Sequence, residues 1–297
     1  MRIAVAGSQG LIGNALVNSL RAAGHTVIRL VRREALDDDE FSWDPETIGL
    51  PPETLDGVDA VVSLGGVGVG NGRWTGRFKQ ELRDSRITPT EVLAEAVREH
   101  GIPTFVSASA TGYYGDTGTR AAVETDPPGE GFLAELVIDW EKAATANAGD
   151  DTRVVLLRTA PVLSASGGML AKLLPLFKLG LGGPIGSGAQ YFSWISLIDE
   201  VRAIEFLLDS DISGPVNLAS PGALPFAEFC KALGKAVHRP AVMRVPEFLA
   251  RTFGGEMAEE MILFSQRVEP RVLTEHGFTF EHPDIRRALD YITKTSS

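Results

Sequence analysis

The stretch that decides the fold is residues 1–31, MRIAVAGSQGLIGNALVNSLRAAGHTVIRLV. Residues 2–6 and 26–31 are short apolar runs, and between them residues 12–23 repeat apolar side chains at three- and four-residue spacing. The two runs are typical of buried strands and the spacing of an amphipathic helix. Gly24 follows the helical pattern as a C-terminal cap. The stretch therefore predicts a strand, a glycine turn, a helix and a second strand.

The glycine turn has the chemistry of an anion site, because backbone N–H groups and the helix dipole point to one spot. Gly7 would permit the turn, Gly10 would let a pyrophosphate approach, and Gly13 would let the helix pack on the strand. The spacing is G-x-x-G-x-x-G rather than G-x-G-x-x-G, and no Gly-Lys-Ser/Thr follows, which excludes a Walker loop. We expect dinucleotide binding; the alternative is a turn that holds no ligand. The candidate cofactor contacts here are Gly7, Gln9, Gly10, Leu11, Ile12 and Gly13.

Two arginines follow the second apolar run. Arg32 and Arg33 come directly after Val31, where NAD sites place a carboxylate. Arginine suits the 2′-phosphate of NADP through its charge and planar fork. We therefore expect NADP rather than NAD, with Val31, Arg32 and Arg33 near it; the alternative is that both arginines are ordinary surface charges. The acidic run 37–40 should be a solvated loop that Trp43 packs down.

Composition limits the functional classes. The chain has 297 residues, a formal net charge of −11 and 44% apolar residues, which suit one globular α/β domain with a smaller lobe. The negative charge argues against nucleic acid or an anionic membrane as partner, and no apolar run is long enough to span a membrane. The single cysteine, Cys230, excludes an internal disulfide and argues against a cysteine-bound metal. The first residues lack a signal-peptide layout, so we expect a cytoplasmic protein.

Strands and helices alternate through the first half. Apolar runs predict strands at 58–64, 104–109 and 153–157, and helical spacing predicts helices at 76–100 and 132–147. Pro89 should kink or restart the first of these helices. The alternation predicts an α/β fold with a doubly wound, parallel Rossmann-type sheet.

The second half is looser and richer in glycine. We expect an NADP-binding domain over 1–160 with contributions from about 190–220, a smaller α/β substrate lobe over 161–297, and within it a small C-terminal domain over about 245–295. The other elements expected there are helices near 170–179, 199–208 and 225–237 and strands near 215–218 and 277–280.

Two loops carry candidate ligand contacts. Gly65 and Gly66 follow the strand at 58–64, at the sheet edge where cofactors bind in doubly wound folds. Arg73 and Trp74 mark a loop that could face a substrate. Gly183 and Trp194 are the candidate substrate contacts in the second half.

A cluster of hydroxyls ends the strand at 104–109. Ser107, Ala108 and Ser109 lead into Thr111, Tyr113 and Tyr114. Hydride chemistry at a hydroxyl carbon needs a proton donor or acceptor within hydrogen-bond reach, and hydroxyls at this edge would face the nicotinamide. The candidate catalytic residues are therefore Ser109, Tyr113 and Tyr114, with Ser107 and Ala108 against the cofactor. The alternative is a turn in which serines cap backbone groups and tyrosines pack.

With these motifs the chain resembles the extended short-chain dehydrogenase/reductases. The resemblance rests on the glycine turn, the Ser109-Ala110-Thr111-Gly112-Tyr113 segment and the segment 192–201. Further stretches resemble the atypical, epimerase-like branch, often labelled nucleoside-diphosphate-sugar epimerases or putative cell-division inhibitors, which has a small C-terminal domain. These stretches are 72–75, 84–87, 112–115, 132–135, 179–188 and 265–268. The resemblance covers nearly the whole chain.

The resemblance implies several further cofactor contacts. It implies NADP, with Arg32 near the 2′-phosphate and Leu64 and Gly65 against the adenosine side. Glu81 and Arg86 lie on the helix that flanks the cofactor in the family, and Arg86 stands where the extended enzymes usually have asparagine. Pro161 and Val162 would approach the nicotinamide.

One departure from the family concerns its catalytic pair, Tyr-x-x-x-Lys. No tyrosine of this chain has a lysine four residues later. Counting back from Glu141, the two positions hold Leu133 and Val137, which cannot transfer a proton. An unassisted tyrosine with a pKa near 10 is a poor base at pH 7.

Three hypotheses follow. The first is an NADP-dependent oxidoreductase acting on a small or nucleotide-linked substrate, with Ser109 and Tyr113 polarising the reacting oxygen. The second is a non-catalytic NADP-binding sensor or interaction protein, and the third is a nucleotide-sugar epimerase. We expect no metal site, because the five histidines show no metal-site spacing. A homodimer is compatible with the sequence, which does not fix the oligomeric state.

Overall fold

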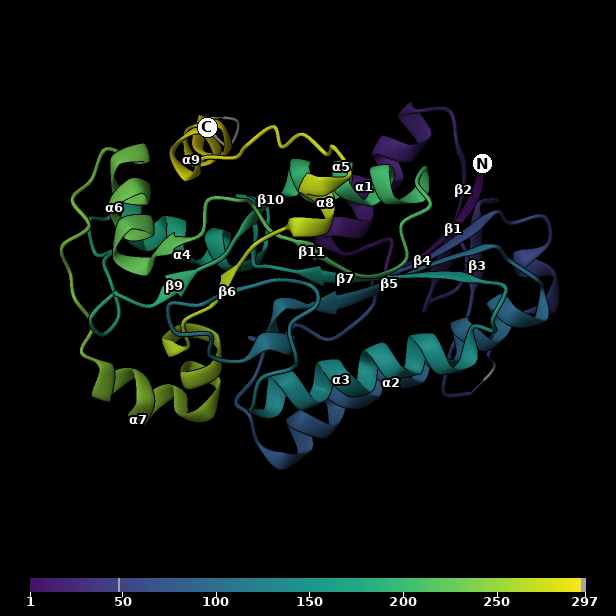
Figure 1. The fold of residues 1–297 in the computed structure, drawn as a ribbon, viewed down its shortest axis with the longest axis horizontal. Coiled ribbons are helices and arrows are strands. Elements are labelled where there is room, and N and C mark those ends of the chain that lie inside the picture. Colours follow the sequence, from purple (N-terminus) through teal and green to yellow (C-terminus); the bar gives the residue numbers. More distant parts are fainter. Residues whose placement is uncertain (48, 295–297) are drawn as a thin grey trace. The chain divides into compact units, whose positions relative to one another are not determined.

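The structure is a computed structural model that describes residues 1–47 and 49–294. The chain forms two compact units, each built from three segments. Unit 1 comprises Met1–Ala110, Leu136–Arg158 and Val201–Val216, and unit 2 comprises Thr111–Glu135, Thr159–Glu200 and the chain from Asn217 onward. Figure 1 shows the elements coloured along the sequence.

A seven-stranded parallel sheet organises the fold, in the order β11-β7-β5-β4-β1-β2-β3. Its strands are β1 (Arg2–Ala6), β2 (Thr26–Val31), β3 (Glu40–Ser42), β4 (Ala60–Ser63), β5 (Thr104–Ala110), β7 (Arg153–Thr159) and β11 (Gly214–Leu218). The central strand β1 pairs with β2 on one side and with β4 on the other. The order reverses between β1 and β4, which is the switch point where doubly wound sheets bind ligands. The predicted fold class is confirmed.

Helices α1 (Leu11–Ala22), α2 (Gly76–Glu99), α3 (Phe132–Asn147) and α5 (Leu197–Leu208) accompany this sheet. Helix α1 ends at Ala23, and Gly24 follows with a φ of +86°, as expected of a glycine after a helix. The restart predicted at Pro89 is wrong, because α2 runs unbroken through it. Pro89 is buried beside Leu82 and Leu93 on the packed face of α2, and that packing offsets the lost backbone hydrogen bond.

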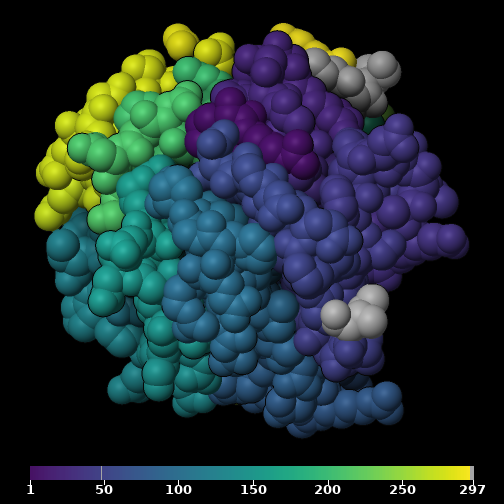
Figure 2. Space-filling view, turned by 90° about the vertical axis from the view of Figure 1, so that its right-hand side faces the viewer, coloured from purple at the N-terminus to yellow at the C-terminus, as the bar shows by residue number. Residues whose placement is uncertain are grey.

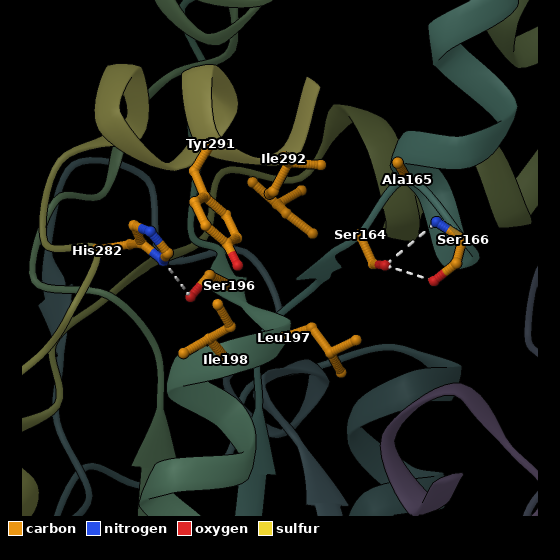
Figure 3. A pocket seen from close by; sticks show the side chains of 10 residues that line it. Ser164, Ala165, Ser166, Ser196, Leu197, Ile198, His282, Tyr291 and Ile292 are labelled. Atoms are coloured by element: carbon orange, nitrogen blue, oxygen red, sulfur yellow. Dashed lines mark hydrogen bonds between the residues drawn. The ribbon is translucent and has the colours of Figure 1, made fainter. Parts of the chain in front are cut away.

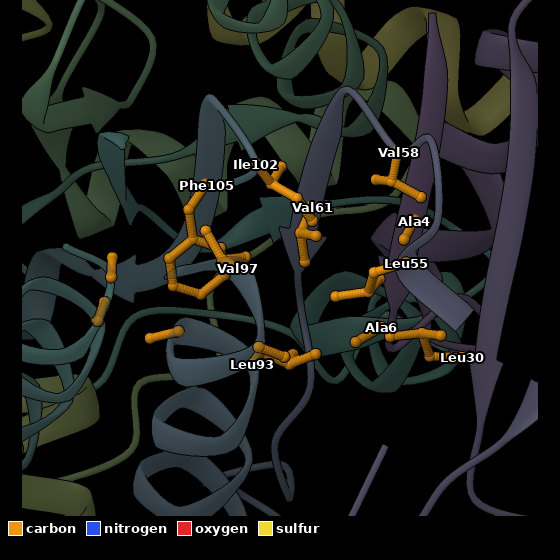
Figure 4. Close-up of a cluster of buried hydrophobic side chains, with 14 of the residues drawn as sticks. Ala4, Ala6, Leu30, Leu55, Val58, Val61, Leu93, Val97, Ile102 and Phe105 are labelled. Carbon is orange, nitrogen blue, oxygen red and sulfur yellow. The ribbon is translucent and has the colours of Figure 1, made fainter. Parts of the chain in front are cut away.

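The core of unit 1 lies between the sheet and α2. Val61, Phe105 and Leu93 are fully buried in it (Figure 4). Trp43 belongs to the same cluster at 3% exposure, so it does anchor the segment after β2.

Unit 2 is assembled from short elements. Its helices are α4 (Gly168–Lys178), α6 (Phe226–Ala236), α7 (Glu247–Ala258), α8 (Arg271–Glu275) and α9 (Ile285–Lys294), with short helical turns η2 (Thr111–Tyr114) and η3 (Glu259–Leu263). Its strands pair two by two: β8 (Val162–Leu163) with β10 (Ile195–Ser196), β9 (Tyr191–Phe192) with β12 (Leu224–Pro225), and β6 (Ala121–Ala122) with β13 (Arg267–Val268). The strand predicted at 277–280 is wrong, since these residues form no strand.

Cys230 is buried in the core of unit 2, with Phe229 and Leu233 of α6 around it. Burial raises the pKa of its thiol to about 12, which fits the predicted role as a small core residue. Figure 2 looks onto a face where the first hundred residues, in purple and blue, gather. Across residues 1–47 and 49–294, no helix is both long and apolar enough to cross a bilayer.

Candidate functional site

The glycine turn lies at the switch point of the sheet. Gly7 has a φ of +78°, a conformation that side chains rarely adopt. A Cβ on Gly7 would lie 2.7 Å from the carbonyl carbon of Leu64. The Leu64 N–H donates to the Ala6 carbonyl at 2.9 Å. The two glycine loops predicted to flank a cofactor, after β1 and after β4, are therefore neighbours.

Helix α1 starts at this turn with its polar end open. Gly10 is the N-cap residue and supplies no side chain to cap the helix, and the first turn carries no acidic residue. A Cβ on Gly13 would overlap the Gly7 carbonyl and lie 2.8 Å from the Gly7 carbonyl carbon. Only glycine at position 13 therefore lets the helix approach the turn this closely. Unpaired N–H groups at such an end, with the helix dipole behind them, bind an anion.

Arg33 is held beside this turn. Its guanidinium makes two 2.7 Å hydrogen bonds to the carboxylate of Glu40, which is the buried first residue of β3. With the amide of Gln9 oriented so that its oxygen faces Arg33, that oxygen accepts from Nε at 2.9 Å and from Nη2 at 3.0 Å. Arg32 is exposed. Both arginines were predicted from the sequence to lie here, but the contacts by which Arg33 links the glycine turn to β3 were not.

The solvated loop predicted for 37–40 is confirmed for Asp37 and Asp38, which are exposed in a turn, whereas Asp39 is half-buried and Glu40 is buried at the start of β3. Arg29 on β2 contacts Asp37 at 2.7 Å, Asp39 at 3.1 Å and Glu40 at 3.0 Å. The hydrogen bonds from Arg33 lower the pKa of the Glu40 carboxyl to about 2. Asp37, Asp39 and Glu40 thus hold the two arginines in place, and the sequence did not reveal these ion pairs.

Arg86 shapes the loop after β4. It is 9% exposed, donates to the Val67 carbonyl at 2.8 Å and to the Leu82 carbonyl at 3.1 Å, and lies over the ring of Trp140 at 5.2 Å. Burial lowers its pKa to about 10. A Cβ on Gly66 would lie 3.2 Å from the guanidinium carbon. Arg86 therefore positions the predicted cofactor loop from behind rather than presenting a free charge.

Of the other predicted cofactor contacts, Glu81 is exposed on α2, and Ser107 is fully buried with its hydroxyl donating to the Ala108 carbonyl at 3.3 Å. In unit 2, Pro161 is exposed and Val162 is half-buried.

Ser109 is part of a buried charged network that the sequence did not reveal. Its hydroxyl donates to Oε1 of Glu141 at 2.6 Å. Arg158 on β7 donates from Nε to the same oxygen at 2.8 Å and from Nη2 to Oε2 at 2.9 Å. All three residues are at most 9% exposed. The Ser109 proton is committed to Glu141, so the hydroxyl can offer a substrate only its lone pairs.

The two candidate tyrosines differ in environment. Tyr113 is half-buried, and its ring meets that of Tyr114 edge-on at 5.3 Å. Tyr114 is 1% exposed, and its hydroxyl donates to Oδ1 of Asn217 at 2.7 Å. Asn217 in turn donates to the Glu269 carbonyl at 2.9 Å. Tyr114 is therefore a buried structural residue, and the catalytic role given to it is withdrawn; Tyr113 keeps its place as a candidate.

The first turn of α3 is capped from the C-terminal part of the chain. Glu260, 6% exposed, accepts the N–H of Phe132 on Oε1 and that of Leu133 on Oε2, each at 2.8 Å. Leu133 is the position that resembles the family's tyrosine. A carboxylate at a helix N-terminus is favoured by the helix dipole, and this cap ties η3 to α3 within unit 2.

The four predicted substrate contacts differ in how exposed they are to solvent. Arg73 is exposed, and Trp74 is half-buried with its indole N–H donating to the Val69 carbonyl at 3.0 Å. Gly183 packs on segment 240–246, since a Cβ there would lie 2.8 Å from the Met243 nitrogen. Trp194 is fully buried in the core of unit 2 and donates to the Gly222 carbonyl at 3.1 Å. Because no face of its indole is open, Trp194 is withdrawn as a substrate contact.

Unit 2 also contains a cavity of about 240 Å³, which Figure 3 shows from close by. The Ser196 hydroxyl lies between Asp199 and His282: it donates to Asp199 Oδ2 at 3.0 Å, and His282 Nδ1 lies 3.1 Å from it. Asp199 is fully buried and also accepts the backbone N–H groups of Glu281 and His282 at 2.7 and 2.9 Å. This network fixes the segment that leads into α9. Over 1–47 and 49–294, no cluster of three or more His, Cys, Asp or Glu side chains is suited to a metal.

Comparisons with known families agree with this geometry. A family model described as "NAD dependent epimerase/dehydratase family" matches residues 3–219, and one described as a domain of unknown function, DUF1731, matches residues 245–292. An epimerase family protein of Mycobacterium tuberculosis is 51% identical over 292 residues, 98% of this chain and 97% of the relative.

Solved structures extend the likeness. The crystal structure of human epimerase family protein SDR39U1 with NADPH superposes with a TM-score of 0.91 at 34% identity, covering 99% of each chain. The UDP-N-acetylglucosamine 4-epimerase from Bacillus cereus shares the fold with a TM-score of 0.80 at 20% identity, again over 99% of each chain. The chain thus belongs to the NAD dependent epimerase/dehydratase family as an atypical short-chain dehydrogenase/reductase related to SDR39U1.

Proposed function

We propose that this protein binds NADP on the glycine turn of unit 1 and transfers a hydride between that cofactor and a small organic substrate. The observation that carries the cofactor assignment is the open N-terminus of α1, which faces a turn built from three glycines and is flanked by Arg33. The human relative SDR39U1, crystallised with NADPH, supports the choice of cofactor.

The choice of NADP over NAD rests on Arg32 and Arg33. A carboxylate in this place would accept the ribose hydroxyls of NAD and repel a 2′-phosphate. Glu40 is the one buried carboxylate beside Arg33 in the described part of the chain, and both of its oxygens accept hydrogen bonds from that guanidinium. Arg33 is therefore pre-oriented, and Arg32 supplies an exposed second cation. Every N–H of Arg33 is already hydrogen-bonded to Glu40, to the Glu34 carbonyl or to the reoriented Gln9 amide. A 2′-phosphate would therefore gain its charge-assisted hydrogen bonds from Arg32, while Arg33 would favour it by neutralising Glu40.

When bound, the nicotinamide ring supplies or accepts the hydride. The chain's own residues must bind the substrate oxygen and manage its proton. Ser109 can accept a hydrogen bond from a substrate hydroxyl, because its own proton is held by Glu141. Tyr113, half-buried on η2, is the candidate group that exchanges the proton. Chemistry without the Tyr-x-x-x-Lys pair should be slow, since Thr117 rather than a lysine stands four residues after Tyr113.

A second candidate function is NADP binding without turnover, as a sensor or an interaction protein. Two observations favour it: Leu133 and Val137 stand at the family's tyrosine and lysine positions, and the Ser109 hydroxyl is bound to a buried carboxylate. Nucleotide-sugar epimerisation, the activity in the names of distant relatives, needs the same missing pair and is the weaker candidate.

A cofactor titration tests the proposal. NADPH and NADH are titrated into the wild type, Arg32→Ala, Arg33→Ala and the control Arg2→Ala, which removes an exposed arginine at the start of β1, and nicotinamide fluorescence is recorded. We expect the wild type and the control to prefer NADPH, and the two test variants to lose that preference. Equal affinity for both cofactors in the wild type would refute the NADP assignment. A panel of carbonyls and alcohols then separates turnover from binding alone.

A further inference from the structure

The cavity of unit 2 is lined by none of the residues that the sequence predicted to bind cofactor or substrate. Three segments far apart in the sequence form its wall: residues 163–166 after β8, residues 196–198 at the start of α5, and a C-terminal part with His282, Tyr291 and Ile292. Its 240 Å³ equals the volume of about eight liquid water molecules and suits a ligand of roughly ten non-hydrogen atoms.

The wall of this cavity is mostly apolar. Leu163, Leu197, Ile198 and Ile292 contribute hydrocarbon surface, and the Tyr291 ring lies beside them. Leu163 is fully buried and Ile292 is 7% exposed, whereas Tyr291 is 46% exposed and borders the opening to solvent. An apolar wall with a few well-placed polar groups is the usual composition of a small-molecule site.

The polar groups lie on opposite sides of the cavity. Figure 3 shows Ser164 and Ser166 on one side and Ser196 and His282 on the other. The Ser164 and Ser166 hydroxyls lie 2.8 Å apart, so one of their two protons bridges the pair. Whichever hydroxyl donates that proton, the other proton has no acceptor within residues 1–47 and 49–294. The serine pair therefore offers a ligand one hydrogen-bond donor.

The opposite side carries a histidine whose tautomer follows from its partners. The Ser196 hydroxyl donates its one proton to Asp199 Oδ2 at 3.0 Å. It must therefore accept from His282 Nδ1, which lies 3.1 Å away. When Nδ1 of a neutral imidazole carries the proton, Nε2 has a lone pair. His282 is 6% exposed, and its Nε2 makes no hydrogen bond within the described part of the chain, so this side offers a ligand an acceptor.

The order of these groups is not that of a catalytic triad. In a triad the histidine takes the serine proton, and the carboxylate holds the histidine. Here Asp199 takes the Ser196 proton directly and also accepts the N–H groups of Glu281 and His282 at 2.7 and 2.9 Å. The arrangement can bind a hydroxyl group, but it does not make Ser196 a nucleophile.

Charge around the cavity favours a neutral ligand. Among the described residues, no Lys, Arg, Asp or Glu side chain lines the wall. The charged side chains of unit 2 on the neighbouring elements are exposed and point to solvent; they are Lys172 and Lys178 on α4, Glu281 and Asp284 before α9, and Arg286, Arg287, Asp290 and Lys294 on α9. An ionised ligand would leave water with no counter-charge on the wall, which is strongly unfavourable. The fully buried Asp199 beside Ser196 would also repel an anion.

The start of α4 adds a preference on the serine side. Helix α4 begins at Gly168, two residues after Ser166, its N-cap Gly167 supplies no side-chain hydrogen bond, and its first turn has no acidic residue. The dipole of such a helix favours an electronegative atom near its N-terminus. The cavity thus suits an acceptor oxygen on the serine side, a hydroxyl on the His282 side and an apolar body between them.

We propose that this cavity binds a neutral small molecule with an apolar body, one hydroxyl group that donates to His282 Nε2, and one carbonyl or ether oxygen that accepts from the Ser164–Ser166 pair. The site is additional to the glycine turn, and its assignment does not depend on the cofactor.

The first test uses 4-methoxybenzyl alcohol as the probe, titrated into the full chain without NADPH and followed by ligand-observed NMR relaxation. Two analogues each lack one polar group: 4-methoxytoluene has no hydroxyl, and 4-methylbenzyl alcohol has no ether oxygen. We expect saturable binding of 4-methoxybenzyl alcohol and roughly fivefold weaker binding of each analogue, as for the loss of one neutral hydrogen bond. The anion 4-methoxybenzoate should not bind.

Variants locate the binding. Leu197→Phe and Ala165→Leu fill the cavity from two sides, and Leu176→Phe, at a position 47% exposed on α4, is the matched control. We expect both filling variants to lose binding and the control to keep it. His282→Phe removes the Nε2 acceptor while Ser196 keeps its bond to Asp199. It should weaken 4-methoxybenzyl alcohol about fivefold and leave 4-methoxytoluene unchanged.

Four results would overturn the proposal. They are no saturable binding of either alcohol by the wild type, undiminished binding by a folded filling variant, binding of 4-methoxybenzoate as tight as that of the alcohol, and an equal effect of His282→Phe on the probes with and without the hydroxyl. Thermal melts check that each variant folds, and if one filling variant unfolds, the other decides. Because NADPH is absent, a failed cofactor titration refutes the proposed function without altering these results.

Discussion

The Ser109 hydroxyl donates a 2.6 Å hydrogen bond to a Glu141 carboxylate that Arg158 also holds through two nitrogens. The network is buried in unit 1 on β5, α3 and β7. A hydroxyl that looks like a catalytic group in the sequence is thus part of a buried ion-paired network. Substitutions in this network can separate what it contributes to the stability of the protein from what Ser109 contributes to function.

Glu141→Ala should destabilise the protein strongly. It removes the carboxylate that two nitrogens of the buried Arg158 guanidinium bind, which costs about 3–5 kcal/mol. Ser109→Ala should cost only about 1–2 kcal/mol, because Glu141 keeps both bonds from Arg158. Urea unfolding measures both. Similar losses for the two variants would show that the ion pair does not dominate the network.

Glu40→Gln should change how stability depends on pH. Hydrogen bonds from Arg33 lower the folded-state pKa of Glu40 from 4.5 to about 2. A lowered carboxyl pKa contributes stability that is present above pH 4.5 and is lost as pH falls toward 2. The melting temperature of the variant should therefore be lower than that of the wild type at pH 6, and the difference should shrink between pH 4.5 and 2. A difference that stays constant over this window would contradict the ion pair.

Glu200 should show the opposite dependence. It is fully buried, accepts from the Thr159 hydroxyl at 2.9 Å, and burial raises its pKa from 4.5 to about 8. The folded state binds the proton more tightly than the unfolded state, so the wild type loses stability as pH rises from 4.5 to 8. Glu200→Gln keeps the acceptor and removes the charge. The variant should gain stability over the wild type progressively across that window, as read from melting temperatures; an unchanged difference would show that Glu200 is already ionised when folded.

Asp199→Ala should loosen the C-terminal segment of unit 2. Asp199 accepts the Ser196 hydroxyl and the N–H groups of Glu281 and His282, and its loss leaves buried donors unpaired, at about 2–4 kcal/mol in total. Asp290→Ala, which removes an exposed carboxylate on α9, is the control. Amide hydrogen exchange should accelerate over 281–294 in Asp199→Ala alone. Unchanged exchange there would show that the carboxylate does not anchor the segment.

The sequence predicts the fold well where one local pattern suffices. The elements β1, α1 and β2 follow directly from the sequence. Their signals, two apolar runs at 2–6 and 26–31 with a glycine turn between them, all lie within about thirty consecutive residues. The position of the glycines after β4 was predicted from the rule that doubly wound sheets bind ligands at the carboxyl ends of their strands. The structure does place Leu64, which precedes these glycines, against Gly7.

Features that depend on distant partners could not be predicted. Glu141 lies 32 residues from Ser109 and 17 from Arg158, and only the sheet order brings β5 and β7 together. The ion pairs of the acidic run with Arg29 and Arg33 could not be predicted, because they form where β3 pairs with β2. Trp194 and Tyr114 lie in stretches read as ligand-facing, but both are buried, and burial is set by the packing of unit 2 rather than by neighbouring residues.

The most direct test of the account is NADPH binding to Gly10→Val, measured by isothermal titration calorimetry against the wild type and Gly76→Val. Gly10 has a φ of −72°, which any residue can adopt, and a Cβ there would lie 3.3 Å from the Gly7 carbonyl oxygen, so that oxygen must shift by a few tenths of an ångström; a thermal melt of the variant checks that it folds. A valine would still occupy the space that the pyrophosphate needs. A Cβ on Gly76, at the start of α2, meets nothing within 4 Å. The account predicts tight NADPH binding by the wild type and Gly76→Val, and a loss of at least about tenfold in Gly10→Val, equal to about 1.4 kcal/mol. Absent NADPH binding by the wild type, or equal binding by Gly10→Val, would contradict the claim that this glycine turn is the cofactor site.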